Sequence, residues 1–391
     1  MTATLAEPLS EVVAAAEKLL TRRIGAPVRL VDPVDLGGSG RTIVLRVRVA
    51  ENQFSLPRTL VIKQVRESSR KSDARRIEFD VPEVANVDVA FLREAVSYQF
   101  ATALATENRP GADLLAYDFD ARLLVLGDLG DSTPFASLLK NPDPDTVTNS
   151  LMAMAQALGR MHAATVGRED DFTALLRRAE VAHCGDVVAE QAAASLETVP
   201  SMLAEHLGIE VSSEVLEVAA RAERLFGGGR FRAFSPSDLC PDNIIVNDEG
   251  VRFLDYEWGG FRDATLDLAY ALVSFPACLC SVELSYERAR AMTEAWRAEV
   301  VGMWPVFADD DFLTERVLDA QLVWVWLSTS LFLPEDYARI AAVRGHQLSA
   351  PRADALSARW ESLARFAEKS GSDAVAQHAS AVLARLRDRA Q

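Results

Sequence analysis

Apolar residues recur with two different periods in the first third of the chain. Residues 9–22 carry them at helical intervals, whereas residues 43–49 alternate strictly, with Leu45, Val47 and Val49 on one face. Short apolar runs separated by glycine, proline and polar residues continue this pattern, which is typical of an antiparallel sheet. The expected strands are residues 28–34, 43–49, 59–65, 114–118 and 123–126.

The rest of the chain has mostly helical spacing. One interruption, residues 231–257, carries strand and turn signals in the middle of this helical part. A further helix is expected over residues 88–106, with Asp88 as its N-cap, and the charged residues 66–87 are expected to form a mobile loop. The pattern therefore predicts an α+β chain of two lobes. The strand-rich N-terminal lobe covers residues 1–126 and the larger helical lobe residues 127–391.

The composition fits a globular protein with a large core, because hydrophobic residues make up 49% of the 391 positions and charged residues 25%. The net charge of −16 argues against nucleic acid or an anionic membrane as a partner. The most apolar run, residues 322–333, is too short to span a bilayer, and the first residues lack the pattern of a signal peptide. We therefore expect a soluble, cytoplasmic protein.

The cysteines do not indicate a disulfide framework, since the chain has only four of them. Cys278 and Cys280 form a C-x-C pair, but no matching Cys or His cluster supplies the other ligands of a zinc site. We interpret them as buried thiols.

The interruption in the helical part contains a hairpin signal. Residues 244–246 and 251–254 are apolar runs joined by Asn-Asp-Glu-Gly, and the glycine can take the left-handed position of a three-residue loop. In that arrangement Asn247 pairs with Val251.

The same register predicts a cluster of polar side chains at the open end of the hairpin. Asn243 then lies opposite Asp255, and Asp238 stands on the preceding loop. Hard oxygen ligands that converge in this way suit Mg²⁺. The alternative is that Asp and Asn gather here only because both favour turns.

The motif Asp238-x-x-x-x-Asn243, followed by the hairpin and by Leu-Asp255-Tyr-Glu, resembles the catalytic and metal-binding loops of the aminoglycoside phosphotransferase and choline kinase group. Residues 263–269 are similar to the group's usual continuation, in which Asp-Leu-Ala opens a helix. The resemblance covers about residues 28–275 and implies a bilobal, protein-kinase-like fold. It also implies ATP or GTP and Mg²⁺ as cofactors, and the hydroxyl of a small molecule as the acceptor.

The resemblance further implies a role for each residue of the motif. Asp238 orients or deprotonates the acceptor hydroxyl, while Asn243 and Asp255 hold Mg²⁺. Since the family varies most in the helices that follow, the acceptor and the oligomeric state are left open. An aminoglycoside, an amino sugar or a choline-like amine fits both the group and the acidic balance.

The N-terminal lobe carries a second set of candidate residues. Lys63 lies in a largely apolar strand, and Glu94 shares a helix face with apolar residues, so the two can satisfy each other. The alternative is a snorkelling lysine and a solvated glutamate. In the kinase fold such a pair positions the α- and β-phosphates.

Two backbone segments complete the predicted nucleotide site, again by resemblance. Gly38, Ser39 and Gly40 lie between two strands, as the phosphate-covering loop does, although a lone glycine turn is weak evidence. Backbone groups at the lobe junction are expected to bind adenine. These belong to Gly127, Asp128 and Leu129.

One departure from the family pattern bears on activity. The family usually has His-Gly before the catalytic Asp, and this chain has Pro236-Ser237 before Asp238. We therefore expect an ATP-dependent phosphotransferase acting on a small-molecule hydroxyl, with a catalytically degenerate, regulatory nucleotide-binding relative as the alternative. Protein kinase activity is not expected, because no Arg precedes Asp238 and the chain lacks D-F-G and A-P-E.

Overall fold

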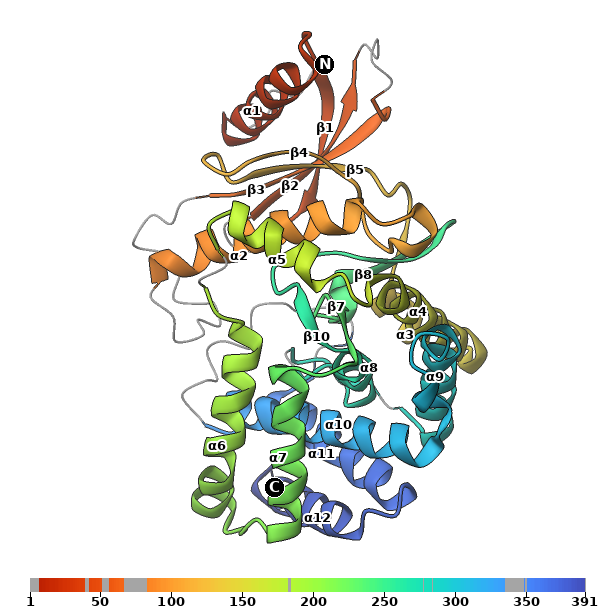
Figure 1. The fold of residues 1–391 in the computed structure, drawn as a ribbon. Helices are drawn as coiled ribbons and strands as arrows, with labels where there is room; N and C mark the ends of the chain where they lie inside the picture. The colour runs from red at the N-terminus through yellow and green to blue at the C-terminus, as the bar shows by residue number, and fades with distance from the viewer. Residues whose placement is uncertain are drawn as a thin grey trace.

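The computed structural model describes residues 7–38, 42–50, 56–66, 83–181, 184–276, 278–282, 284–334, 348 and 350–390. Within them the chain forms a small part built on a sheet and a larger, mainly helical part beside it (Figure 1). The expected fold class, α+β with a small antiparallel sheet and a large helical part, is confirmed.

The five-stranded sheet has the order β1-β2-β3-β5-β4, and each neighbouring pair is antiparallel. The two helices of this part cover opposite faces (Figure 1). In β5, Val125 packs with the residues of α1, while Leu124 packs with those of α2. The elements are α1 (Glu7–Ile24), β1 (Leu30–Gly37), β2 (Thr42–Val49), β3 (Thr59–Val65), α2 (Glu83–Thr102), the short helix η1 (Thr106–Asn108), β4 (Leu114–Asp118) and β5 (Leu123–Gly127).

The helical part is organised around α10, which packs against the α-helices α6, α7, α8 and α11 and against the short helix η3. Trp324 and Trp326 of α10 are buried, as expected for an apolar core helix. The helices are α3 (Phe135–Leu139), α4 (Pro144–Thr165), α5 (Glu169–Arg178), α6 (Val187–Leu207), α7 (Ser213–Gly227), α8 (Ala264–Leu272), α9 (Tyr286–Val300), η3 (Pro305–Ala308), α10 (Asp310–Phe332), α11 (Arg352–Lys369) and α12 (Asp373–Ala390).

The interruption of the helical pattern forms two small sheets. β7 (Arg232–Ser235) pairs with β10 (Gly260–Asp263), and β8 (Ile244–Asn247) pairs with β9 (Gly250–Phe253) and with β6 (Thr133–Pro134). The short helix η2 (Pro241–Asn243) precedes β8. The loop that carries Asp238 lies in the sequence between β7 of the first sheet and β8 of the second.

All five expected strands of this sheet are present, with ends shifted by up to three residues, but the second helix differs from its prediction. It begins at Glu83 instead of residue 88, so Asp88 lies inside the helix and the N-cap assignment is wrong. Most of the predicted loop at residues 66–87, namely residues 67–82, lies outside the described residues. None of the helices in the described part of the chain is both long and apolar enough to cross a membrane.

Helices α4 and α9 approach each other closely at Gly159. A Cβ atom at this position would lie 2.8 Å from Cβ of Glu299 and 2.9 Å from the carbonyl oxygen of Trp296. Because both neighbours belong to the α9 backbone or its first side-chain carbon, they cannot move aside without moving the helix. Glycine is therefore required by the packing at this position.

Gly159→Ala is expected to destabilise the protein by about 1–3 kcal/mol, because the added methyl group must push α4 and α9 apart. This loss occurs although alanine is the better helix former. Chemical denaturation of both proteins measures the difference. Gly227→Ala in α7 is the matched control, since nothing lies within 4 Å of its Cβ position, and it should be neutral or slightly stabilising. Equal effects of the two substitutions would contradict the packing explanation.

Candidate active site

A buried lysine links three elements at the boundary between the sheet and the helical part. The Nζ atom of Lys63 on β3 lies 2.6 Å from Oε1 of Glu94 on α2 and 2.5 Å from Oδ1 of Asp255, which follows β9. The side chains of Lys63 and Glu94 are only 9% and 2% exposed, whereas that of Asp255 is 35% exposed. The structure thus brings together three of the residues singled out in the sequence, from positions far apart in the chain.

Burial and charge act in opposite directions on this group. Burial raises the pKa of Glu94 to about 7, and the nearby Lys63 offsets only part of that effect. Burial alone would lower the pKa of Lys63, but Asp255 and Glu94 outweigh it and hold that pKa well above its usual value. The two carboxylates thus favour the charged form of Lys63, while burial favours the protonated form of Glu94.

The hairpin that leads to Asp255 has a different register from the one predicted. Asn247 pairs with Gly250 and Ile244 with Phe253, so the loop has two residues, and the predicted pairing of Asn247 with Val251 is wrong. Asn247 caps the tight turn, because its Oδ1 accepts the N–H of Glu249 at 3.0 Å.

In the observed register Asn243 lies opposite Leu254, whose N–H donates to the Asn243 carbonyl at 2.8 Å. Asp255 stands one position beyond this pair. Its backbone is left-handed, with φ of 55°, an uncommon conformation for a residue other than glycine. This turn of the backbone carries the Asp255 side chain to Lys63.

The loop before the hairpin holds Asp238 and Asn243 close together. The Asn243 side-chain Nδ2 donates to the backbone carbonyl of Asp238 at 3.3 Å, which turns the amide oxygen of Asn243 away from that carbonyl. Asn243 is buried, and Asp238 is half-buried. The amide oxygen of Asn243, a potential metal ligand, and the carboxylate of Asp255 thus belong to residues at the same end of the hairpin.

This donor set fits Mg²⁺ better than a softer metal. The atoms that Asn243 and Asp255 could offer to a metal are hard oxygens. Mg²⁺ takes few protein ligands and completes its shell with water and phosphate oxygens.

A buried carboxylate, that of Asp267 on α8, is linked by hydrogen bonds to the start of the Asp238 loop. Trp296 Nε1 donates to His162 Nδ1 at 3.0 Å, and an indole can only donate, so the proton of His162 resides on Nε2. That N–H faces Oδ2 of Asp267 at 3.0 Å. His162 therefore has a structural role.

Two serines and an arginine continue this network to the loop itself. Ser235 Oγ donates to Oδ1 of Asp267 at 2.7 Å and lies 3.0 Å from Oγ of Ser237. Arg262, which is 1% exposed, donates to Ser237 and, at 2.6 Å, to Asp186. We call these residues, together with His162 and Trp296, the Asp267 network. The sequence identified Ser237 only as a departure from the family pattern, and Ser235 and Arg262 were missed, because serines and an arginine near a turn carry no specific signal.

The two predicted backbone segments are described only in part. Gly38 is the last described residue before the turn. A Cβ atom on Gly38 would collide with the carbonyl oxygen of Thr42, so this close approach of the backbone requires glycine. Ser39 and Gly40 lie outside the described residues.

At the other segment, several groups already have partners. The N–H of Gly127 is bonded to a neighbouring backbone carbonyl at 2.8 Å, and the carbonyl of Leu129 accepts from Asn247 at 2.8 Å. Asp128 pairs with Arg46 of β2 at 3.0 Å. These contacts tie the start of the helical part to the sheet.

No protein-family model matches the chain, and no curated protein matches it in sequence. Several solved structures resemble it in fold, among them the three that follow. A choline kinase from Cryptosporidium parvum Iowa II has a TM-score of 0.48 and 10% identity over 94% of this chain and 97% of that one. A putative fructosamine-3-kinase from Thermobifida fusca has a TM-score of 0.44 and 16% identity, over 90% of this chain and 98% of that one. A ternary complex of an aminoglycoside phosphotransferase with streptomycin and ATP has a TM-score of 0.41 and 13% identity, over 87% of this chain and 100% of that one.

At such low TM-scores and identities these likenesses carry no functional weight, so the functional case rests on the geometry of the site.

Glu94→Gln is expected to flatten the dependence of the unfolding free energy on pH between about 4.5 and about 7. In the wild type the folded state keeps Glu94 protonated up to a pKa of about 7, whereas the unfolded chain releases this proton near the ordinary value of 4.5. The folded state therefore holds more protons in this interval, and stability falls as pH rises, by at most about 1.4 kcal/mol for each pH unit. Urea denaturation at several pH values measures the slope.

The matched control for this prediction is Glu107→Gln, because Glu107 is exposed in η1. It should leave the slope as it is in the wild type. An unchanged slope in Glu94→Gln would show that burial of Glu94 does not set the pH dependence.

Proposed function

We propose that the protein is a phosphotransferase that uses Mg·ATP or Mg·GTP to phosphorylate a hydroxyl of a small molecule. The observation that carries the proposal is the contact of buried Lys63 with both Glu94 and Asp255. A lysine held between two carboxylates can bind phosphate oxygens, while the partly exposed carboxylate, Asp255, can hold a metal ion. The sheet part, residues 1–126, and the helical part, residues 127–391, are the two lobes that enclose the nucleotide.

Each residue then has one task. Lys63, oriented by Glu94, grips the α- and β-phosphates, and Asn243 and Asp255 hold Mg²⁺, which neutralises charge on the phosphates. Asp238 orients the acceptor hydroxyl and accepts its proton. Because phosphoryl transfer has a loose transition state, positioning and charge neutralisation supply most of the rate.

The backbone contributes the remaining nucleotide contacts in this proposal. The turn of Gly38, Ser39 and Gly40 covers the phosphates. Adenine binds to those backbone groups between Gly127 and Leu129 that other residues do not already use.

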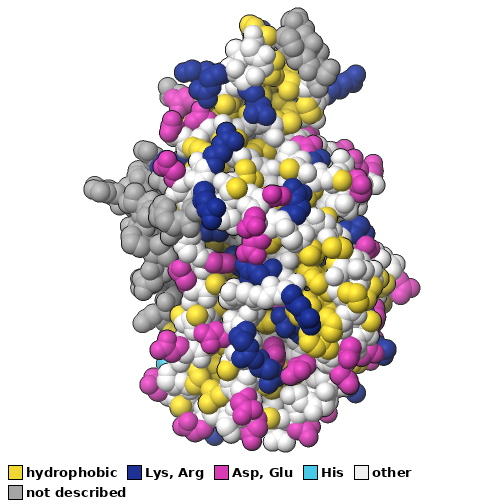
Figure 2. Space-filling view, viewed as in Figure 1, with side chains coloured by type: hydrophobic (Ala, Val, Ile, Leu, Met, Phe, Trp, Pro, Cys, Tyr) yellow, Lys and Arg dark blue, Asp and Glu magenta, His cyan; other side chains and the backbone are white. Residues whose placement is uncertain are grey.

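A small, neutral or cationic acceptor fits the charge of the molecule best. The net charge is −16, and on the face drawn in Figure 2 Lys and Arg side chains lie among Asp and Glu instead of forming one basic patch. Amino sugars, aminoglycosides and choline-like amines are the acceptor classes that we infer from this balance and from the family resemblance.

The second candidate is a nucleotide-binding regulatory protein that has lost catalysis. The observation in its favour is Pro236-Ser237 in place of the usual His-Gly. Both candidates predict nucleotide binding, so only phosphate transfer separates them.

Asp238→Ala is expected to lower the turnover number for phosphate transfer by about 10²–10⁴-fold, because the acceptor hydroxyl loses the group that orients it and takes its proton. The affinity for Mg·ATP should stay nearly the same, since Asp238 does not hold the phosphates in this proposal. Transfer from labelled ATP to a panel of hydroxylated amines and sugars measures the first quantity, and calorimetric titration measures the second.

Asp248→Ala on the exposed hairpin turn is the control and should change neither quantity. Full turnover in Asp238→Ala would exclude Asp238 from catalysis. A wild-type protein that binds Mg·ATP but transfers no phosphate to any acceptor would favour the regulatory candidate.

A further inference from the structure

A buried tyrosine contacts the carboxylate of Asp238. Tyr270 lies on α8 and is 1% exposed, and its hydroxyl donates to Oδ1 of Asp238 at 3.2 Å. The backbone N–H of Cys240 approaches the same oxygen at 3.3 Å. Oδ1 thus accepts two hydrogen bonds from groups that belong to different parts of the chain.

The direction of the hydrogen bonds follows from the chemistry of the groups. The Tyr270 oxygen also lies 3.3 Å from Sγ of Cys240. An ionised carboxylate can only accept, so the single phenolic proton points to Asp238, and the thiol proton of Cys240 points to the tyrosine oxygen. Burial raises the pKa of both Tyr270 and Cys240, so each keeps the proton that this arrangement requires at neutral pH.

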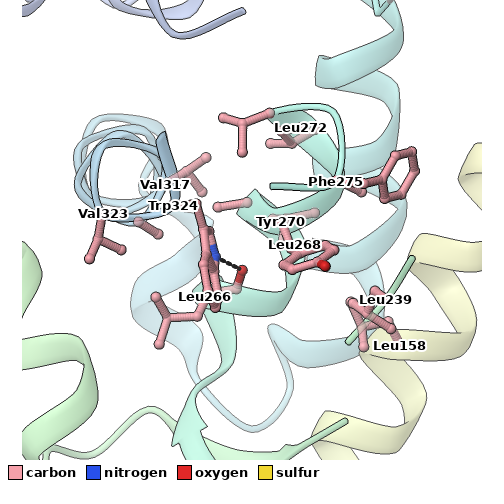
Figure 3. Packing of buried hydrophobic residues seen from close by; sticks show 14 of the residues in the cluster. Leu158, Leu239, Leu266, Leu268, Tyr270, Leu272, Phe275, Val317, Val323 and Trp324 are labelled. Carbon is pink, nitrogen blue, oxygen red and sulfur yellow. Dashed lines mark hydrogen bonds between the residues drawn. The ribbon is translucent and has the colours of Figure 1, made fainter. Parts of the chain in front are cut away.

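Tyr270 itself has little freedom to move. The indole of Trp324 packs edge-on against its ring, with centroids 5.2 Å apart, and Trp324 Nε1 donates to the carbonyl of Leu266 at 2.7 Å. Figure 3 shows this hydrogen bond and the apolar side chains of α8 and α10 around it. Because the indole is fixed to the backbone of α8 and packs on its tyrosine, the phenol is held rigidly with respect to the Asp238 loop.

We propose that Tyr270 is a positioning residue for phosphate transfer: it fixes the carboxylate of Asp238 so that its second oxygen meets the acceptor hydroxyl. This inference rests on the proposed function, because it assigns Asp238 the role of orienting the acceptor. A carboxylate with two donors on one oxygen cannot rotate without breaking both bonds, so the direction of the other oxygen is set before the acceptor binds. Tyr270 does not touch the nucleotide in this proposal and acts through Asp238 alone.

Tyr270→Phe tests the proposal, since it removes the hydroxyl and keeps the ring against Trp324. The expected result is a fall in kcat of about tenfold to a hundredfold, the usual effect of losing one hydrogen bond to a charged group. The KM for ATP should be unchanged, because the phosphate-binding residues are untouched. A merely structural role would instead change the thermal midpoint and both kinetic constants together.

Tyr256→Phe is the matched control for the loss of a buried hydroxyl. Tyr256 is 0% exposed, and its hydroxyl has no hydrogen-bond partner among the described residues, so its removal should leave kcat and KM unchanged. A double variant, Asp238→Ala with Tyr270→Phe, should be no slower than Asp238→Ala alone, because Tyr270 has nothing left to position.

The outcomes separate the two proposals. If the wild type transfers phosphate and Tyr270→Phe keeps the full kcat, the role of Tyr270 is wrong and the proposed function stands. If the double variant is clearly slower than Asp238→Ala, Tyr270 acts by another route and the inference is equally wrong. If the wild type transfers phosphate to no acceptor in the panel, the proposed function itself fails, and the role of Tyr270 fails with it.

Discussion

The buried ammonium group of Lys63 is the charge on which the site depends. An ammonium so far from solvent needs close carboxylates, and it has two, Glu94 and Asp255, which leaves one excess negative charge among the three groups. A proton or a cation can neutralise this excess. Burial raises the pKa of Glu94 to about 7, so a proton on Glu94 neutralises the excess charge at lower pH. In the proposed function a divalent cation on the partly exposed Asp255 would neutralise it at higher pH. In the proposed function, a metal-bound phosphate would neutralise the same excess charge.

Two further constraints hold the loops around this charge. Asp255 and Ser237 both have left-handed backbones, with φ of 55° and 65°, which cost free energy unless their surroundings hold them. Asp255 is held by its ion pair with Lys63. Ser237 is held from the other side, where Arg262 donates to its hydroxyl and Ser235 connects it to Asp267. Unusual backbone geometry therefore occurs at both loops, and at each one a polar contact compensates for it.

The sequence predicted those parts of the site that follow from the spacing of apolar residues and from the cost of burying a charge. The alternation of residues 43–49 and the lone lysine of the strand at residues 59–65 identified the sheet and the Lys63–Glu94 contact, because a charge in an apolar strand requires a partner. The hairpin register could not be predicted in the same way. A two-residue and a three-residue loop fit Asn-Asp-Glu-Gly equally well, and the choice depends on the Asn247 side chain, which bonds both its own turn and Leu129. The Asp267 network was also out of reach, since it joins residues between positions 162 and 296 through tertiary contacts alone.

The Asp267 network bears on whether Pro236-Ser237 marks a loss of catalysis. Buried polar groups in folded proteins are nearly always hydrogen-bonded, so the support of the Asp238 loop can be judged from such bonds. Here the carboxylate of Asp267 has donors on both oxygens, and the hydroxyl of Ser237 receives a hydrogen bond from Arg262. Within the Asp267 network, Nε of Arg262 is the one buried side-chain atom that has no hydrogen-bond partner among the described residues. Ser237 and Arg262 thus support the Asp238 loop, and this support favours the proposed phosphotransferase over the regulatory candidate.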